Sequence, residues 1–113
     1  MYQFNRRCLA LCLAAVSSAC SGAQMQESRL VEVQSSLRAA EQAGAAADPK
    51  GARLLESARF GVMRSVSVAD RGDAANADLF LDRAQADAEL ALQLARANEE
   101  RRRAREAWTE KKP

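Results

Sequence analysis

The sequence predicts an all-α protein, either an antiparallel three-helix bundle or a helical hairpin with a long, projecting C-terminal helix. Alanine, the strongest helix former, dominates the chain, and only 4% of the residues are aromatic. Both prolines, Pro49 and Pro113, lie at the edges of segments, where they interrupt no helix. In the remaining sequence, apolar residues recur at alternating spacings of three and four, which places them on one face of a helix.

The first expected helix covers residues 24–46. Its apolar residues fall on one face because they are three or four positions apart. This face would contain Leu30, Val33, Leu37, Ala40 and Gly44.

The second expected helix begins at Asp48-Pro49. An aspartate accepts hydrogen bonds from the free N–H groups of a first helical turn, and proline fits the first position because its N–H is not needed there. Gly72 is placed to end this helix in the left-handed conformation, and Asp73 to cap the next helix. Gly61 either weakens the helix or allows a neighbour to approach closely. The predicted buried face consists of Leu55, Ala58, Val62, Val66 and Ala69.

The third expected helix runs from Ala74 to at least Arg105. It carries a narrow seam of mostly small side chains, which would allow tight antiparallel packing against the second helix. Larger apolar residues widen this surface, and part of that width would cover the first helix. The seam consists of Ala77, Leu81, Ala84, Ala88, Ala91 and Ala95, and the wider surface adds Leu79, Phe80, Leu90, Leu92 and Leu94.

The first 19 residues have the pattern of a secretion signal. Arg6 and Arg7 precede an apolar stretch at residues 8–16. This stretch is too short to cross about 30 Å of hydrocarbon as a helix, which takes roughly 20 residues. It has the length expected of a signal-peptide core behind a positive leader.

The end of this signal, Ser17-Ser18-Ala19-Cys20, resembles a lipobox, the cleavage site of the lipoprotein signal peptidase. That pattern usually has leucine at the position of Ser17, although small residues are tolerated. The resemblance implies cleavage between Ala19 and Cys20 and covalent attachment of lipid to Cys20. The alternative is an ordinary signal peptide that leaves Cys20 free.

The lipid on Cys20 would anchor the protein to a membrane without a transmembrane helix. We expect no other cofactor. Ser21 follows Cys20, where an aspartate commonly marks inner-membrane retention in Gram-negative lipoproteins. This resemblance implies the cell envelope, at the periplasmic face of the outer membrane. The expected organisation is a cleaved signal (1–19), a lipidated tether (20–27), an alanine-rich helical domain (28–100) and a charged helix extension (101–113).

Charge and composition exclude several classes of function. Removing Arg6 and Arg7 from the 17 basic residues leaves 15, equal to the 15 acidic residues, so we expect no nucleic-acid partner. The chain has no histidine, the commonest general base and metal ligand. Carboxylates such as Asp78 and Asp82 share a helix face with basic neighbours and are interpreted as solvated. We therefore expect no enzyme, no catalytic residue and no metal site.

Several segments share features with a known family: Ala39–Ala45, Asp48-Pro49, Ala52–Leu55 with Ala58, Gly72-Asp73 and Arg83–Ala91. They resemble a bacterial lipoprotein family catalogued as domain of unknown function 4398, over residues 28–104. The resemblance implies a small helical envelope protein, of a kind sometimes fused to peptidoglycan-binding domains of the outer-membrane protein A type. Because the family has no established activity, the resemblance assigns no functional residue.

The C-terminal segment is the candidate interaction site, and it has two interpretations. It is either a solvated helix end supported by pairs such as Glu99–Arg103, or a basic docking segment for an anionic surface or a partner protein. In the second interpretation Trp108 would be the anchor. The candidate docking residues are Arg101, Arg102, Arg103, Arg105 and Trp108.

Two functions fit these observations. The first is a non-enzymatic, membrane-anchored envelope lipoprotein that acts as a structural or adaptor module for an envelope protein or a peptidoglycan-associated partner. The second is a ligand-binding or transport accessory lipoprotein that holds an apolar molecule between its helices. A carrier needs a cavity of about 300 Å³ or more, whereas alanine-lined seams leave little void.

Overall fold

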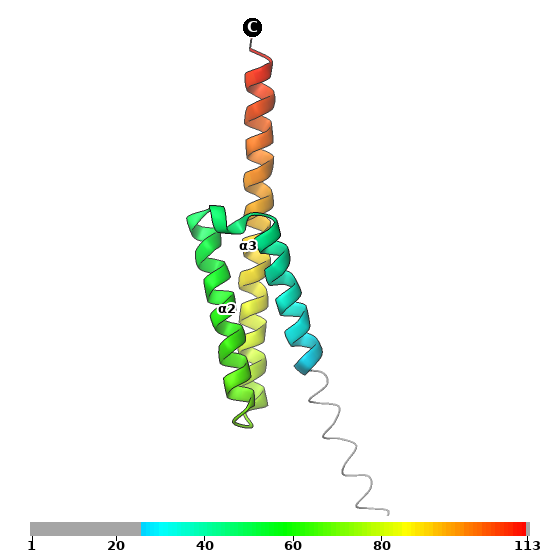
Figure 1. The fold of residues 1–113 in the computed structure, drawn as a ribbon, viewed down its shortest axis with the longest axis vertical. Helices are drawn as coiled ribbons and strands as arrows, with labels where there is room; N and C mark the ends of the chain where they lie inside the picture. The colour runs from blue at the N-terminus through cyan, green and yellow to red at the C-terminus, as the bar shows by residue number, and fades with distance from the viewer. Residues whose placement is uncertain (1–25, 113) are drawn as a thin grey trace, which may run out of the picture.

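The computed structural model describes residues 26–112, and these residues are helical apart from three short connections and the last two residues (Figure 1). A first helix at residues 26–42 is followed by the short 3₁₀ helix η1 (Ala45–Ala47), by α2 (Pro49–Ala69) and by the long α3 (Ala74–Glu110). The described range contains no strand. The prediction of an all-α fold with a long C-terminal helix is therefore confirmed.

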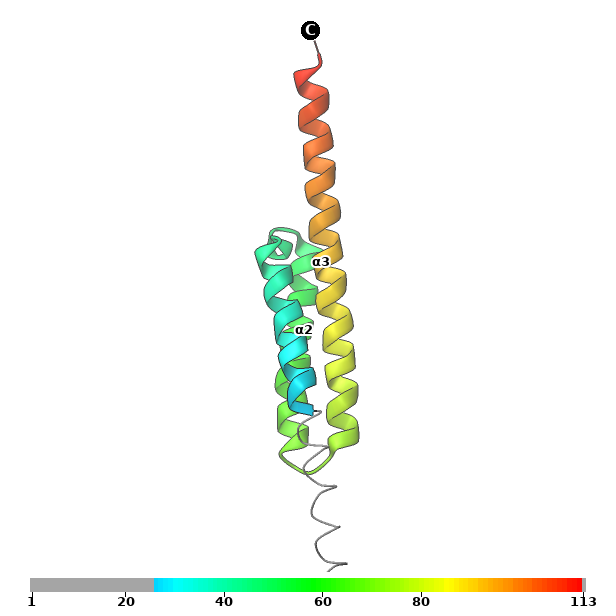
Figure 2. The ribbon, with the colours of Figure 1, turned by 90° about the vertical axis from the view of Figure 1, so that its right-hand side faces the viewer.

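The first helix, α2 and α3 lie side by side as an antiparallel bundle (Figures 1 and 2). One buried apolar cluster joins all three helices, with Val33 and Leu37 from the first helix, Leu55 from α2 and Leu81 from α3. Leu55 and Leu81 are the largest side chains that are almost completely buried. The arrangement is the three-helix form of the predicted fold, because the first helix contributes its own residues to the core.

The first helix ends earlier than the sequence predicts. Val33, Leu37 and Ala40 are buried as expected. Gly44 was expected on the same apolar face, and this prediction is wrong: Gly44 is exposed and has a φ of 83°, in the left-handed region. Glycine adopts this conformation without steric cost and so ends helices, which is why the helix stops at residue 42. At its other end, residues 26 and 27 of the expected tether are helical.

The start of α2 follows the prediction. The side chain of Asp48 accepts a hydrogen bond from the backbone N–H of Gly51 at 2.9 Å, and Pro49 occupies the first turn. Gly51 is itself buried, because its α-carbon lies against the backbone of η1. A Cβ added there would lie 2.2 Å from the backbone oxygen of Ala45. The cap and this close approach fix where α2 begins.

The predicted buried face of α2 is correct at Leu55 and Ala58, partly correct at Val62 and Ala69, and wrong at Val66. Val66 is 42% exposed, while Gly61, Ser65 and Val68 are buried instead. Val62 and Ala69 are half-buried. The reason is that α3 comes closest where α2 carries its smallest side chains. A Cβ added to Gly61 would lie 3.0 Å from the Cβ of Ala84, which confirms close approach as the role of this glycine.

The connection between α2 and α3 also follows the prediction. Gly72 has a φ of 85°, and the side chain of Asp73 accepts a hydrogen bond from the backbone N–H of Asn76 at 3.2 Å. The amide of Asn76 donates a second bond to Asp73 at 2.6 Å. These two hydrogen bonds hold the pKa of Asp73 below its usual value, the side-chain bond contributing most.

The seam of α3 is confirmed in full. All six residues, from Ala77 to Ala95, are buried, with at most 6% of the surface of any of them exposed. The wider apolar surface is only partly buried. Leu92 packs against the core, whereas Leu79 and Leu90 are 65% and 43% exposed. Five of the six seam residues are alanines, so the backbones of α2 and α3 can approach closely.

Polar side chains tie the helices together at the surface of the bundle. Arg29 of the first helix lies 3.5 Å from Asp78 of α3 and also pairs with Asp82. Contacts of this kind between exposed groups stabilise weakly, and they mainly favour one alignment of the helices. Further contacts join Arg59 to Glu41 (2.5 Å), Ser57 to Asp87 (2.6 Å) and Gln85 to Ser36 (2.9 Å).

The end of α3 projects beyond the bundle, as the sequence predicts (Figure 1). Ala95 is the last seam residue, and every residue from 100 to 112 is exposed. The helical part of this exposed segment, residues 100–110, is about 16 Å long at 1.5 Å per residue. Residue 26 and the α2–α3 turn lie at the opposite end of the bundle (Figures 1 and 2). Among the described residues, no helix combines the length and apolarity needed to span a membrane.

Candidate functional site

The predicted sites lie at two places in the chain, and the structure describes only one of them. The expected cleavage and lipidation residues, Ala19 and Cys20, lie outside the described residues. The candidate docking residues all lie in the projecting segment of α3, residues 100–112, which we call the extension. Its helix ends at Glu110, and Lys111 is its C-cap. The extension is therefore an ordered, exposed helix.

Two of the candidate docking arginines are engaged within the extension. Arg102 donates to Glu99 at 2.9 and 2.7 Å, and a further nitrogen lies 2.5 Å from Glu106. Arg103 donates to Glu99 at 2.8 Å. These partners are three or four residues apart, which is the spacing at which side chains meet on a helix. The sequence predicts the Glu99–Arg103 pair, but it does not show which of the four arginines have carboxylate partners.

The proton affinities of this cluster reflect the pairing. Hydrogen bonds from Arg102 and then Arg103 lower the pKa of the Glu99 carboxyl from 4.5 to about 2. The hydrogen bond to Glu99, together with the charge of Glu106, raises the pKa of Arg102 above its usual value. All these groups are exposed to solvent, so water screens their attraction. These pairs stabilise the helix locally, within about one turn.

The other basic residues of the extension keep their charge uncompensated. Arg101 donates only to the neutral amide oxygen of Asn98, at 3.1 Å. Arg105, Lys111 and Lys112 form no ion pair with any residue in the described range. The two lysines were not among the candidate docking residues. Their position beside Trp108 at the helix end could have been recognised from the sequence.

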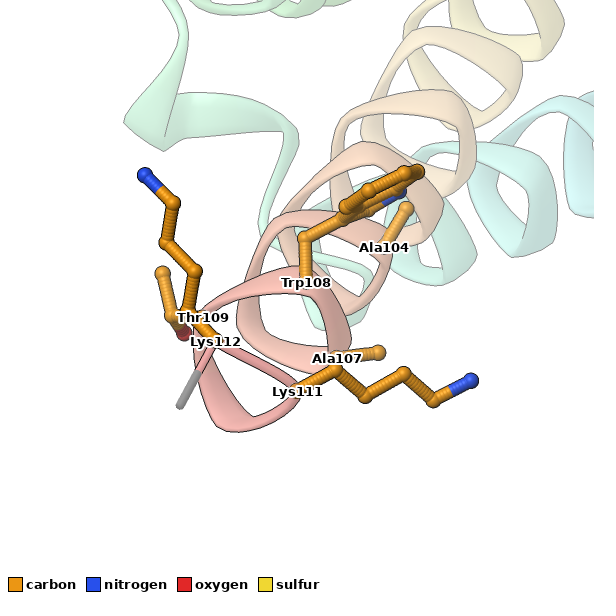
Figure 3. A pocket seen from close by; sticks show the side chains of 6 residues that line it. All are labelled: Ala104, Ala107, Trp108, Thr109, Lys111 and Lys112. Atoms are coloured by element: carbon orange, nitrogen blue, oxygen red, sulfur yellow. The ribbon is translucent and has the colours of Figure 1, made fainter.

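Trp108 is the most exposed large apolar side chain among the described residues, at 78%. An open depression of about 590 Å³ surrounds it (Figure 3). Its lining comes from the end of α3 alone: Ala104, Ala107, Trp108, Thr109, Lys111 and Lys112. A depression lined by a single helix cannot enclose a small molecule. It can be covered by a partner that brings its own concave surface.

A smaller depression lies between the helices near residue 26. It is lined by Leu30 of the first helix, Val66 and Ala69 of α2, and Leu81 of α3, among others, and measures about 240 Å³. This is below the roughly 300 Å³ at which cavities for drug-sized ligands begin. Within residues 26–112, no group of three or more acidic or other metal-binding side chains is close enough together to hold an ion.

Comparisons with known proteins add no relative. No protein-family model matches the chain, and no curated protein or solved structure is significantly similar to it.

Proposed function

We propose that this protein is a non-enzymatic, lipid-anchored lipoprotein of the bacterial envelope. In this proposal the bundle is a spacer that presents the extension to another envelope component. The N-terminal pattern supports the anchor, because the residues before Cys20 resemble a lipobox. Ser21 after the cysteine favours the periplasmic face of the outer membrane. The relationship to the domain family named above is part of the same proposal.

The observation that carries the proposal is the placement of the two ends. The described chain begins at one end of the bundle, beside the α2–α3 turn, and α3 ends beyond the opposite end (Figure 1). A lipid on Cys20 would precede residue 26 by only six residues. The extension would then point away from the membrane that holds the anchor. Ala74 and Trp108 are 34 residues apart on one helix, which corresponds to about 51 Å.

A spacer function also fits the way in which the bundle is built. The helices pack through alanines and glycine, so the core is thin and contains little space for a ligand. The depression between the helices near residue 26 is smaller than a carrier requires. A larger depression of about 460 Å³ at the end of the bundle is lined by charged residues such as Asp48, Glu99 and Arg102, which do not suit an apolar ligand. The candidate docking residues lie instead on the extension, which contributes nothing to the core.

The proposal predicts that the extension is needed for binding but not for folding. We would compare the full-length protein with a version that lacks residues 101–113. The melting temperatures should agree, because none of residues 101–112 belongs to the buried core. The truncated protein should recover less of its partner when envelope proteins and purified peptidoglycan are tested separately at low and high salt. Equal recoveries from the two versions would contradict the proposal.

A further inference from the structure

Together with Glu99, the extension presents two faces that have the same residue spacing and are centred on opposite sides of the helix. Arg101, Ala104, Arg105 and Trp108 occupy relative positions 0, 3, 4 and 7, which lie on one side of a helix. A second set has the same spacing but begins two residues earlier, which is about 200° around the helix. The second set consists of Glu99, Arg102, Arg103 and Glu106. We call the first set the Trp face and the second the paired face.

The paired face is electrically balanced. It contains two glutamates and two arginines, and each of them forms an ion pair with another member of the set. These contacts lie within one helical turn, so they favour the helical form of the extension. The paired face therefore holds the helix in shape before any partner arrives. A preformed helix loses less conformational entropy when it binds.

The Trp face is cationic. Neither Arg101 nor Arg105 has a carboxylate partner among the residues that the structure describes. Trp108 lies beside Ala104, and the side chains of Lys111 and Lys112 extend on either side of it (Figure 3). No acidic residue falls on this face, and Glu100 lies about a quarter turn from its centre.

The composition of the Trp face indicates the kind of surface that it fits. Trp and Arg are the residues that most often dominate binding energy at protein interfaces. Arginine forms paired hydrogen bonds with carboxylates, and an exposed helix with anchors at these spacings suits a groove on a partner. The depression around Trp108 is open, so the partner must supply the pocket.

A lipid surface fits the Trp face less well than a groove on a protein does. Helices that lie in a membrane interface bury a broad apolar face, whereas the Trp face offers one indole and one alanine. The extension also points away from the end of the bundle that would carry the anchor (Figure 1).

We propose that the Trp face binds in a groove of a partner protein that encloses Trp108 and carries carboxylates for Arg101 and Arg105. This inference rests on the proposed adaptor function and adds the binding face and the chemistry of the partner. It also divides the four arginines by role: two bind the partner, and Arg102 and Arg103 stabilise the helix.

Two matched pairs of variants separate the faces. Arg101→Gln with Arg105→Gln, and Arg102→Gln with Arg103→Gln, each remove two positive charges from the same segment, but from opposite faces. Trp108→Ala removes the anchor, and Phe60→Ala, which removes an exposed aromatic side chain from α2, is its control. Glutamine and arginine have similar helix propensities, so the substitutions themselves favour the helix equally. Circular dichroism of each variant checks its helix content. If the Arg102/Arg103 variant loses helix, the Trp108 and Phe60 variants decide the test.

The experiment is photocrosslinking of the full-length protein in its bacterial host. A photoreactive benzoylphenylalanine replaces Ala104 on the Trp face or, as a control, Glu110 on the other side. We expect a protein adduct from position 104 and not from position 110. Its yield should fall about tenfold or more in the Arg101/Arg105 and Trp108 variants, as for hot-spot residues. It should stay within about twofold in the Phe60 variant, and in the Arg102/Arg103 variant if that retains its helix.

Three results would overturn the inference. The first is an equal yield of adducts from positions 104 and 110, or no adduct from either. The second is an equal loss of adduct yield in the matched variants, provided that both retain their helix. The third is binding to lipid in place of a protein. For the last, phosphatidylglycerol vesicles are the probe, because Trp108 is the single tryptophan and its emission reports directly on this face. If deletion of residues 101–113 abolishes recovery but the variants show no difference between faces, the inference fails and the adaptor function stands. If the deletion changes nothing, the adaptor function itself fails.

Discussion

The two parts of α3 share one continuous helix but have opposite surroundings. From Ala77 to Ala95 the helix packs through small residues that are almost completely buried. From residue 100 onwards it is exposed on all sides and held by ion pairs between residues three and four apart. Tertiary packing stabilises the first part, whereas the second depends on local side-chain pairs. The comparison shows that one continuous helix can be held by tertiary packing over one part and by local side-chain pairs over the next.

The largest difference between the two parts should appear when an alanine is enlarged. Ala88 is fully buried in the seam, and Ala107 is exposed on the extension. Ala88→Leu should destabilise the bundle by about 1–3 kcal/mol, because overpacking forces helices apart. Ala107→Leu should change stability by less than about 0.5 kcal/mol. Thermal melts of the two variants test this, and equal melting temperatures would mean that the seam is not a close contact.

A second comparison tests the observed face of α2. Val68 is 6% exposed and Val66 is 42% exposed on the same helix. Val68→Ala should cost about 1–2 kcal/mol through lost burial, and Val66→Ala less than about 0.5 kcal/mol. Urea unfolding of both variants would measure this difference. A greater loss at Val66 would restore the face that the sequence predicted.

The smallest effect should come from acid. The pKa of Glu99 is lowered to about 2 in the folded protein, from 4.5. A lowered folded-state pKa means that the contribution of Glu99 is complete above about pH 4.5 and is lost as the pH falls towards 2. Helix content, followed by circular dichroism, should fall more over this range in the wild type than in Glu99→Gln. Parallel curves for the two proteins would show that Glu99 does not hold the extension.

The sequence predicts the regular parts of this fold well. The seam of α3 could be identified because its spacing is uninterrupted, and the caps at Asp48 and Asp73 because their chemistry is local. The face of α2 was misassigned at Val66, because a hydrophobic pattern selects valines, whereas Gly61 and Ser65 are the buried residues there. Hydrophobic patterns do not register a contact that depends on the absence of a side chain.

The position of the candidate site could be predicted from the sequence, but its two faces could not be distinguished. Counting basic residues finds the extension as a whole. Its two faces can be told apart only when the hydrogen-bonding partner of each arginine is known. In the structure Glu99 pairs with Arg102 and Arg103 but not with Arg101. The lipidation of Cys20 stays a prediction, because this residue lies outside the described range.

The central claim is that the anchor and the extension lie at opposite ends of the molecule. It can be tested on the protein bound to membranes through its lipid. Cys20 is the only cysteine after residue 19, and its thiol is blocked once it carries lipid. A single labelling site can then be added by Arg71→Cys at the α2–α3 turn or by Lys111→Cys at the end of α3. A fluorophore at position 71 should be quenched by a quencher attached to lipid headgroups, and one at position 111, about 55 Å along α3, should not. Cys20→Ser should release both labelled proteins from the membrane. Equal quenching at the two positions, or membrane retention of the Cys20→Ser variants, would contradict the claim.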